Sequence, residues 1–261
     1  AGIKPVVGCD VWLSNDEDRD KPTRILLLVA NQAGYLALCQ LLTRAWLENA
    51  HRGRAEMRRE WLEGVQGLIV LSGARGGDIG QALLAGNHHL AKSLALSWKK
   101  TFPDSFYIEL QRTEAEADQA YVHAALSLAS ECELPVVATH PVQFIGPTEF
   151  QAHEARVCIS EGEILTNPRR PKWFTRDQYL LSSAEMYERF HDVPSALANA
   201  VAIAQRCNLT LELGQPRLPN FPTPEGVTLD DYLIQLSEQG LERRMLQLFP
   251  DPVKRQEAYP L

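Results

Sequence analysis

Short apolar runs alternate with longer amphipathic segments along the first half of the chain. Five apolar runs, the first of them rich in β-branched residues, favour buried strands at residues 5–13, 24–30, 67–73, 106–110 and 134–139. Apolar residues recur at helical spacing over residues 31–45, 78–100 and 114–132. Continuous apolar runs that alternate with amphipathic helices predict βαβ units and a parallel sheet or barrel covered on both faces.

The strand signal fades from about residue 148, where helical patterns replace it at residues 149–160, 183–191 and 195–206. Ser182 and Glu185 have the spacing of a capping box at the start of the second. Four prolines between residues 214 and 226 exclude a regular element there. We therefore predict a first domain over 1–213, an extended connector over 214–227 and a helical region over 228–261, which Thr228 caps.

The composition is ordinary for a globular protein, with 45% hydrophobic and 23% charged residues. The formal net charge of −7 argues against a surface that binds nucleic acid throughout, but it allows a local basic patch. No apolar run approaches the roughly 18 residues that span a bilayer, so we expect no membrane contact. The five cysteines are widely spaced, which is typical of reduced structural thiols in a cytoplasmic protein.

A series of segments resembles the PHP (polymerase and histidinol phosphatase) domain of the alpha subunits of bacterial DNA polymerase III. The series includes Leu71-Ser72-Gly73 and residues 2–11, 106–112, 134–139, 152–159, 196–199, 203–208, 218–224 and 232–233, in the family's order and spacing. The resemblance implies a distorted (β/α)7-type PHP barrel, similar to a TIM barrel, with a C-terminal helical extension. It places the first barrel strands before Ala1, and it makes residues 228–261 the start of the polymerase core, whose palm and Mg²⁺ ions lie beyond Leu261.

An active PHP site surrounds two or three metal ions with His, Asp, Glu and sometimes Cys ligands, which activate water. By this resemblance, Asp10 matches an acidic ligand, but Arg24 replaces a histidine and Ala74 a frequent cysteine. Pro141 and Gln143 stand where the family has Asp-x-His. Because a guanidinium cannot coordinate a cation, we predict a vestigial metal site without metal or other cofactor. We also predict a salt bridge between Arg24 and Asp10 across the vacated cleft.

Other candidate ligands are weaker. His140 lies one position before the lost aspartate and stays open as a substitute ligand, although one imidazole and one carboxylate cannot hold a binuclear centre. The glycine-rich turn at residues 73–78 lacks the Lys-Ser/Thr of a P-loop and predicts a tight strand exit. Adjacent His88 and His89 diverge on a helix, and His153-Glu154 has no second histidine at i+4, so we expect surface and packing roles respectively.

Two basic clusters have two possible interpretations. They form a solvated surface, or they contact DNA phosphates or another replisome subunit. Their members are Arg52, Arg54, Arg58 and Arg59, and then Arg169, Arg170, Lys172 and the adjacent Trp173. Basic residues beside an exposed tryptophan favour both kinds of contact, so the second cluster is the stronger candidate.

The resemblance implies a part of the catalytic alpha subunit of the replicative polymerase, a cytoplasmic DNA-directed DNA polymerase. Within it, we expect this segment to be an inactive scaffold and a docking surface for the proofreading exonuclease (epsilon) subunit and other replisome subunits. The alternative is a metal-dependent PHP phosphoesterase or intrinsic 3′–5′ exonuclease, which needs the missing ligands. An independent interaction protein that retains the fold is a third interpretation, against which the connector into another helix argues.

Overall fold

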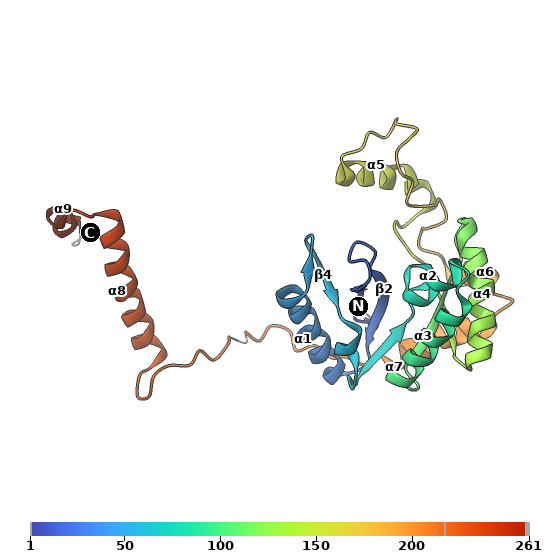
Figure 1. Cartoon of the computed structure of the whole chain (residues 1–261), viewed down its shortest axis with the longest axis horizontal. Coiled ribbons are helices and arrows are strands. Elements are labelled where there is room, and N and C mark those ends of the chain that lie inside the picture. The colour runs from blue at the N-terminus through green and yellow to red at the C-terminus, as the bar shows by residue number, and fades with distance from the viewer. Residues whose placement is uncertain (1, 217, 259–261) are drawn as a thin grey trace. The chain divides into compact units, whose positions relative to one another are not determined.

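A computed structural model describes residues 2–216 and 218–258, which divide into two compact units, residues 1–211 and residues 212–261. The first unit is a mixed α/β domain and carries every predicted site residue (Figure 1). The second contains helices α8 (Leu229–Leu248) and α9 (Pro252–Ala258), and the Thr228 side chain caps α8 as predicted. The domain and connector roles predicted for these segments stay predictions.

The described residues of the first unit form one seven-stranded sheet in the order β3-β4-β1-β2-β5-β6-β7. Three neighbouring pairs are parallel and three antiparallel. The sheet is compatible with a distorted barrel but is open in the described part of the chain, where β3 and β7 are not paired. The strands are β1 (Gly8–Leu13), β2 (Thr23–Val29), β3 (Ala50–His51), β4 (Arg54–Met57), β5 (Leu68–Leu71), β6 (Phe106–Gln111) and β7 (Val136–Thr139).

The prediction of a parallel arrangement was wrong for β2, which runs antiparallel to both β1 and β5. Only residues 14–22 connect β1 to β2, and a parallel crossover needs about a dozen residues or more. The sequence reading also missed β3 and β4, which are too short to show periodicity. Arg52 and Gly53 join them with φ of 49° and 76°, as the two central positions of a type I′ hairpin turn require.

One face of the sheet carries the main hydrophobic core. Val11, Leu27 and Ile108 point toward this face, where α1 (Gln32–Glu48), α2 (Asp78–Leu84), α3 (His88–Thr101) and α4 (Glu116–Cys132) contribute the other core residues. The single helix predicted over 78–100 is two helices. Gly86, with φ of 74°, ends the first, and the Asn87 side chain accepts a hydrogen bond from the Leu90 amide to cap the second.

The opposite face is apolar at only one end. There Ile69, Tyr107 and Val137 pack with Ile203 of α7 (Pro194–Arg206). The remaining helices of this unit are α5 (Phe150–Glu161) and α6 (Ser183–Arg189). Residues 141–181, which we call the lobe, contain α5, and α5 stands apart from the helices around the sheet (Figure 1). In the described residues, no helix combines the length and the apolarity that membrane crossing requires.

Candidate functional site

A polar hollow of about 520 Å³ lies at the other end of this second face, where the apolar cluster ends. Strand alternation explains its position. Arg24, Glu109 and Thr139 line the hollow, and they point to the same side of the sheet as Leu28, Tyr107 and Val137 of the apolar cluster. The structure brings together six predicted positions, since the lining includes Asp10, Arg24, His140, Pro141, Gln143 and Trp173.

Arg24 and Asp10 form the predicted salt bridge. In the antiparallel register of β1 and β2, Trp12 lies opposite Arg24, so Asp10 is the diagonal neighbour of Arg24 on the same face. The Arg24 Nη2 atom lies 2.6 Å from the Asp10 Oδ2 atom, which confirms the pair. Arg24 also lies over Trp12, with Cζ 5.5 Å from the ring centroid. The guanidinium therefore has two partners inside the cleft.

Ala74 follows the Leu71-Ser72-Gly73 turn and is buried. Gly73 adopts φ of 76°, and a Cβ atom there would lie 2.0 Å from the Arg24 carbonyl oxygen. This close approach fits the tight strand exit that we predicted for the glycine-rich turn. The methyl group of Ala74 offers no electron pair, so this position cannot supply a metal ligand.

The segment after β7 is bound to residues 177–180 of the lobe. His140 Nε2 donates to the Asp177 carbonyl at 2.9 Å, and Gln178 Nε2 donates to the Pro141 carbonyl at 3.1 Å. Burial lowers the pKa of His140, which favours the neutral imidazole. Its Nδ1 atom is buried and has no hydrogen-bond partner among the described residues. The role of His140 as a substitute ligand stays a prediction.

The sequence reading missed the buried carboxylate at the base of the hollow. Glu109 on β6 accepts hydrogen bonds from Thr139 Oγ1 at 2.5 Å and from Gln111 Nε2 at 3.0 Å. Burial raises the pKa of Glu109, because desolvation disfavours the charged carboxylate. A charged residue in the otherwise apolar run 106–110 is the signal that would have revealed it.

A second ion pair lies in the same hollow. Arg75 Nε lies 3.2 Å from Asp118 Oδ1, and Thr113 Oγ1 donates to Asp118 Oδ2 at 2.5 Å. Asp10, Glu109 and Asp118 are thus each bound to neighbouring side chains. Within residues 2–216 and 218–258, no group of three or more His, Cys, Asp or Glu side chains is placed to hold a metal ion.

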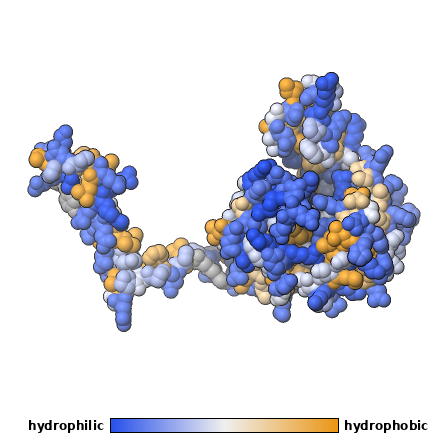
Figure 2. Space-filling model, in the orientation of Figure 1, coloured by the Kyte–Doolittle hydropathy of each residue, from blue (hydrophilic) through white to orange (hydrophobic). Residues whose placement is uncertain are grey.

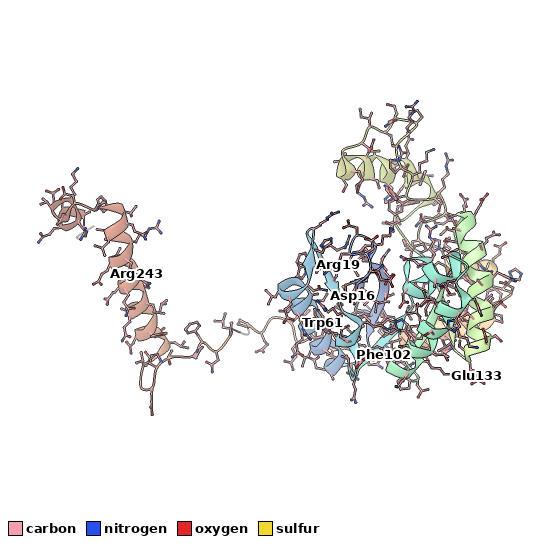
Figure 3. The ribbon with its side chains drawn as sticks, in the orientation of Figure 1. Asp16, Arg19, Trp61, Phe102, Glu133 and Arg243 are labelled. Carbon is pink, nitrogen blue, oxygen red and sulfur yellow. The ribbon has the colours of Figure 1, made fainter. Side chains whose placement is uncertain are left out.

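The basic clusters differ from their sequence interpretation. In the first, Arg54 and the Arg19 labelled in Figure 3 both pair with the fully buried Glu56. Arg59 pairs with Asp78, at 3.0 Å. Arg54 and Arg59 thus belong to internal networks, whereas Arg52 and Arg58 form exposed ion pairs with Asp20 and Glu60, as the solvated-surface alternative allows.

In the second cluster, the expectation that Arg170 is available for an external contact is wrong. Its side chain is only 9% exposed and is paired with the buried Glu154 of α5. A paired and desolvated guanidinium is not available to an external anion. The predicted contact with DNA or a partner subunit is therefore left with three side chains. Arg169, Lys172 and Trp173 are exposed. The expectations for the remaining histidines fit the structure: His88 is exposed, and His153 packs edge-on against Phe174.

Sequence comparison finds a family match in the first part of this domain. Residues 1–113 match the family model described as "PHP domain". The strands β1 and β2, with Asp10 and Arg24, and the turn that holds Ala74 lie within this match.

The whole chain is similar to one named protein, DNA polymerase III subunit alpha. It is 47% identical to the Pseudomonas aeruginosa subunit, 49% to that of Neisseria meningitidis serogroup A and 43% to that of Escherichia coli K12. These alignments cover 99–100% of this chain but only 22–23% of each relative. The resemblance is thereby confirmed: residues 1–113 match the PHP domain, and the chain aligns throughout with a part of these subunits, spanning less than a quarter of their length.

Proposed function

We propose that this chain is part of the catalytic alpha subunit of a replicative DNA polymerase III, and that its PHP domain is a noncatalytic scaffold. Alignment along the whole chain with alpha subunits from several bacteria supports the first statement. The observation that carries the second is the ion pair between Arg24 and Asp10, 2.6 Å apart in the hollow.

The physical argument concerns cations. The family pattern has a histidine at the position of Arg24, and a guanidinium has no lone pair to offer a metal. Its fixed positive charge also repels a cation, and the guanidinium is bound to the Asp10 carboxylate that would otherwise be a ligand. Metal-dependent hydrolysis needs an ion that lowers the pKa of bound water, so a site that cannot hold one loses this chemistry. What remains is a packed domain around a charge-balanced cleft.

We extend the proposal to partners and location. The scaffold docks the proofreading exonuclease (epsilon) subunit and other replisome subunits, and it reaches DNA through the parent polymerase in the cytoplasm. The polymerase chemistry and its Mg²⁺ ions belong to the palm of the parent protein. The family resemblance supports these statements, and the 43–49% identity with alpha subunits makes the resemblance strong.

One observation favours the alternative, a metal-dependent phosphoesterase or intrinsic 3′–5′ exonuclease. The unpartnered Nδ1 atom of His140 belongs to a side chain that lines the same hollow as Asp10. Neutral imidazole is a common ligand of zinc and manganese. The two functions differ in a property that can be measured directly, the metal-dependent hydrolysis of a phosphoester.

The test uses the full polypeptide that contains this chain, with its native N-terminus. We expect primer extension with Mg²⁺ and co-elution with the exonuclease subunit in gel filtration. We expect no hydrolysis of a single-stranded 3′ end or of p-nitrophenyl phosphate with Zn²⁺ or Mn²⁺. The matched variant is Asp10→Asn, which keeps the shape of the side chain and removes its charge. If the unsubstituted protein hydrolyses these substrates and Asp10→Asn abolishes the hydrolysis, the phosphoesterase function would be established instead.

A further inference from the structure

In the described part of the first unit, lysine and arginine side chains without a polar partner are concentrated in one segment of the lobe. Most lysines and arginines of the first unit bond carboxylates, carbonyls or other side chains. Among its described residues, four have neither an ion pair nor a side-chain hydrogen bond: Lys100, Arg169, Lys172 and Arg176. Three of the four fall within residues 169–176. Unpaired cations that gather in eight residues form a local site for an anion.

This segment forms one wall of a hollow of about 780 Å³. Arg170, Lys172 and residues 174–176 line it, and Pro171 and Trp173 line a recess beside Cys158 and Glu161. The opposite wall is the start of α5, with Phe150 and Gln151. The volume lies in the range of sites for small molecules the size of a nucleotide.

The lining combines cations with aromatic rings. Phe150 and Phe174 both line the hollow, and the Arg176 Cζ atom lies 5.7 Å from the centroid of the Phe150 ring. Trp173, on the other side of the segment, is 61% exposed. Figure 2 shows the lobe, at the top of the view, as a hydrophilic surface interspersed with hydrophobic residues. Cations beside accessible aromatic faces are the combination that binds unstacked bases and their phosphates.

Buried contacts hold the two walls together. Glu154 of α5 is 4% exposed and pairs with Arg170, which fixes the segment against the helix and neutralises that arginine. Phe174 packs edge-on against His153, with ring centroids 4.7 Å apart. The free positive charge therefore comes from Lys172 and Arg176, opposed within the lining by the exposed Glu114. The hollow is preorganised, because its shape depends on interactions inside the lobe.

We propose that the lobe binds single-stranded nucleic acid. Arg169, Lys172 and Arg176 contact the phosphates, and unstacked bases lie against Phe174 and the exposed face of Trp173. The inference rests on the proposed function, which brings this domain to DNA, and adds a contact that adjoins the metal-site cleft, because Trp173 and Phe174 also line that cleft. A duplex buries the faces of its bases, so the aromatic groups favour a single strand over a duplex. An acidic protein segment is the competing ligand, and the experiment separates the two.

The experiment uses the full polypeptide and a 20-nucleotide single strand that carries 5-iodo-deoxyuridine, which cross-links to aromatic side chains in contact with it. After irradiation, mass spectrometry identifies the cross-linked peptides. We expect a cross-linked peptide that contains Trp173 and Phe174, in at least tenfold lower yield with the matched duplex. The double charge reversal Lys172→Glu/Arg176→Glu should lower its yield at least tenfold. Cross-links elsewhere in the polypeptide, unchanged by the substitutions, show that each variant is folded.

The matched control is Lys100→Glu, the exposed and unpaired lysine in a hollow lined by residues that precede β5 and β6. It should leave the lobe cross-link unchanged. Cross-links elsewhere but none at residues 169–176, or equal yields in the double variant, would overturn the inference and leave the proposed function standing. Cross-links nowhere would overturn both. In a competition assay, poly-glutamate and unlabelled single strand are compared as inhibitors of the lobe cross-link. If both inhibit it at the same concentration, the surface binds an acidic protein, and the nucleic-acid proposal is rejected.

Discussion

The Nη2 atom of Arg24 lies 2.6 Å from the Oδ2 atom of Asp10, across the diagonal of the antiparallel pair β1 and β2. Both side chains are about half exposed, so the ion pair changes the charge of the cleft but contributes little to the stability of the domain. By the family resemblance, Arg24 stands where a histidine ligand is expected, and in the structure it balances the charge of Asp10.

The ion pair between Arg24 and Asp10 should contribute little to stability. A double-mutant cycle with Arg24→Gln and Asp10→Asn should give a coupling energy of about 0.2–1 kcal/mol from urea unfolding, because solvent screens exposed pairs. The coupling should weaken in about 1 M salt, where the Debye length falls to roughly 3 Å. A coupling above about 2 kcal/mol that salt does not change would contradict the half-exposed geometry.

The buried pair of Arg170 and Glu154 should matter more. Arg170→Met leaves Glu154 buried without a partner, which should destabilise the lobe clearly more than the loss of an exposed arginine. Adding Glu154→Leu should restore much of this loss, because it removes the isolated charge. Hydrogen exchange of the α5 amides measures both effects locally. The neighbouring exposed Arg169→Met is the control and should change exchange by less than about 0.5 kcal/mol; an equal effect at both arginines would argue against a buried pair.

Glu109 should make stability depend on pH. Burial raises the pKa of Glu109 in the folded state above its ordinary value of 4.5, so the folded state binds more protons than the unfolded state above that pH. The stability that protonated Glu109 contributes is therefore fully present below the pKa of the unfolded state. It is lost as the pH rises through the raised pKa of the folded state. Glu109→Gln should be more stable than the unsubstituted chain at pH 7, with the difference shrinking toward pH 4.5. Thermal unfolding across this range measures it, and parallel pH profiles for the two proteins would show that burial does not perturb Glu109.

The turn after β5 should be intolerant of a side chain. Gly73 and Gly86 both have positive φ, 76° and 74°, but only at Gly73 would a Cβ atom meet the backbone, 2.0 Å from the Arg24 carbonyl oxygen. Gly86→Ala should cost about 1 kcal/mol for backbone strain alone, and Gly73→Ala should cost clearly more, because the turn must move. Urea unfolding compares them. Equal costs would show that the turn adapts without displacing Arg24.

The sequence predicted most of the elements and the ion pair, for identifiable reasons. The apolar runs around Ile25, Ile69 and Ile108 are long enough to mark strands, and these residues are fully buried. The directions of the strands were harder to predict, because a run that is apolar throughout looks alike in parallel and antiparallel sheets. The nine-residue connection between β1 and β2 held the missing information.

The site was predictable only where the family pattern names a residue. The positions of Asp10 and Arg24 came from that pattern, and the structure pairs them. Glu109 and the pair of Arg75 and Asp118 come from three separate segments, and only the folded sheet brings them to one hollow. The burial of Arg170 was equally hidden, since nothing in a basic run shows which member finds a buried carboxylate.

The metal content of the full polypeptide, with its native N-terminus, tests the account most directly. Elemental analysis after dialysis against buffer with micromolar Zn²⁺ and Mn²⁺ should find far less than one ion for each PHP domain. The positive control restores the family's donors with Arg24→His, Ala74→Cys, Pro141→Asp and Gln143→His, and it should raise the content. A stoichiometric ion in the unsubstituted protein that Asp10→Asn removes would show that the cleft still holds metal, and the scaffold interpretation would then be wrong.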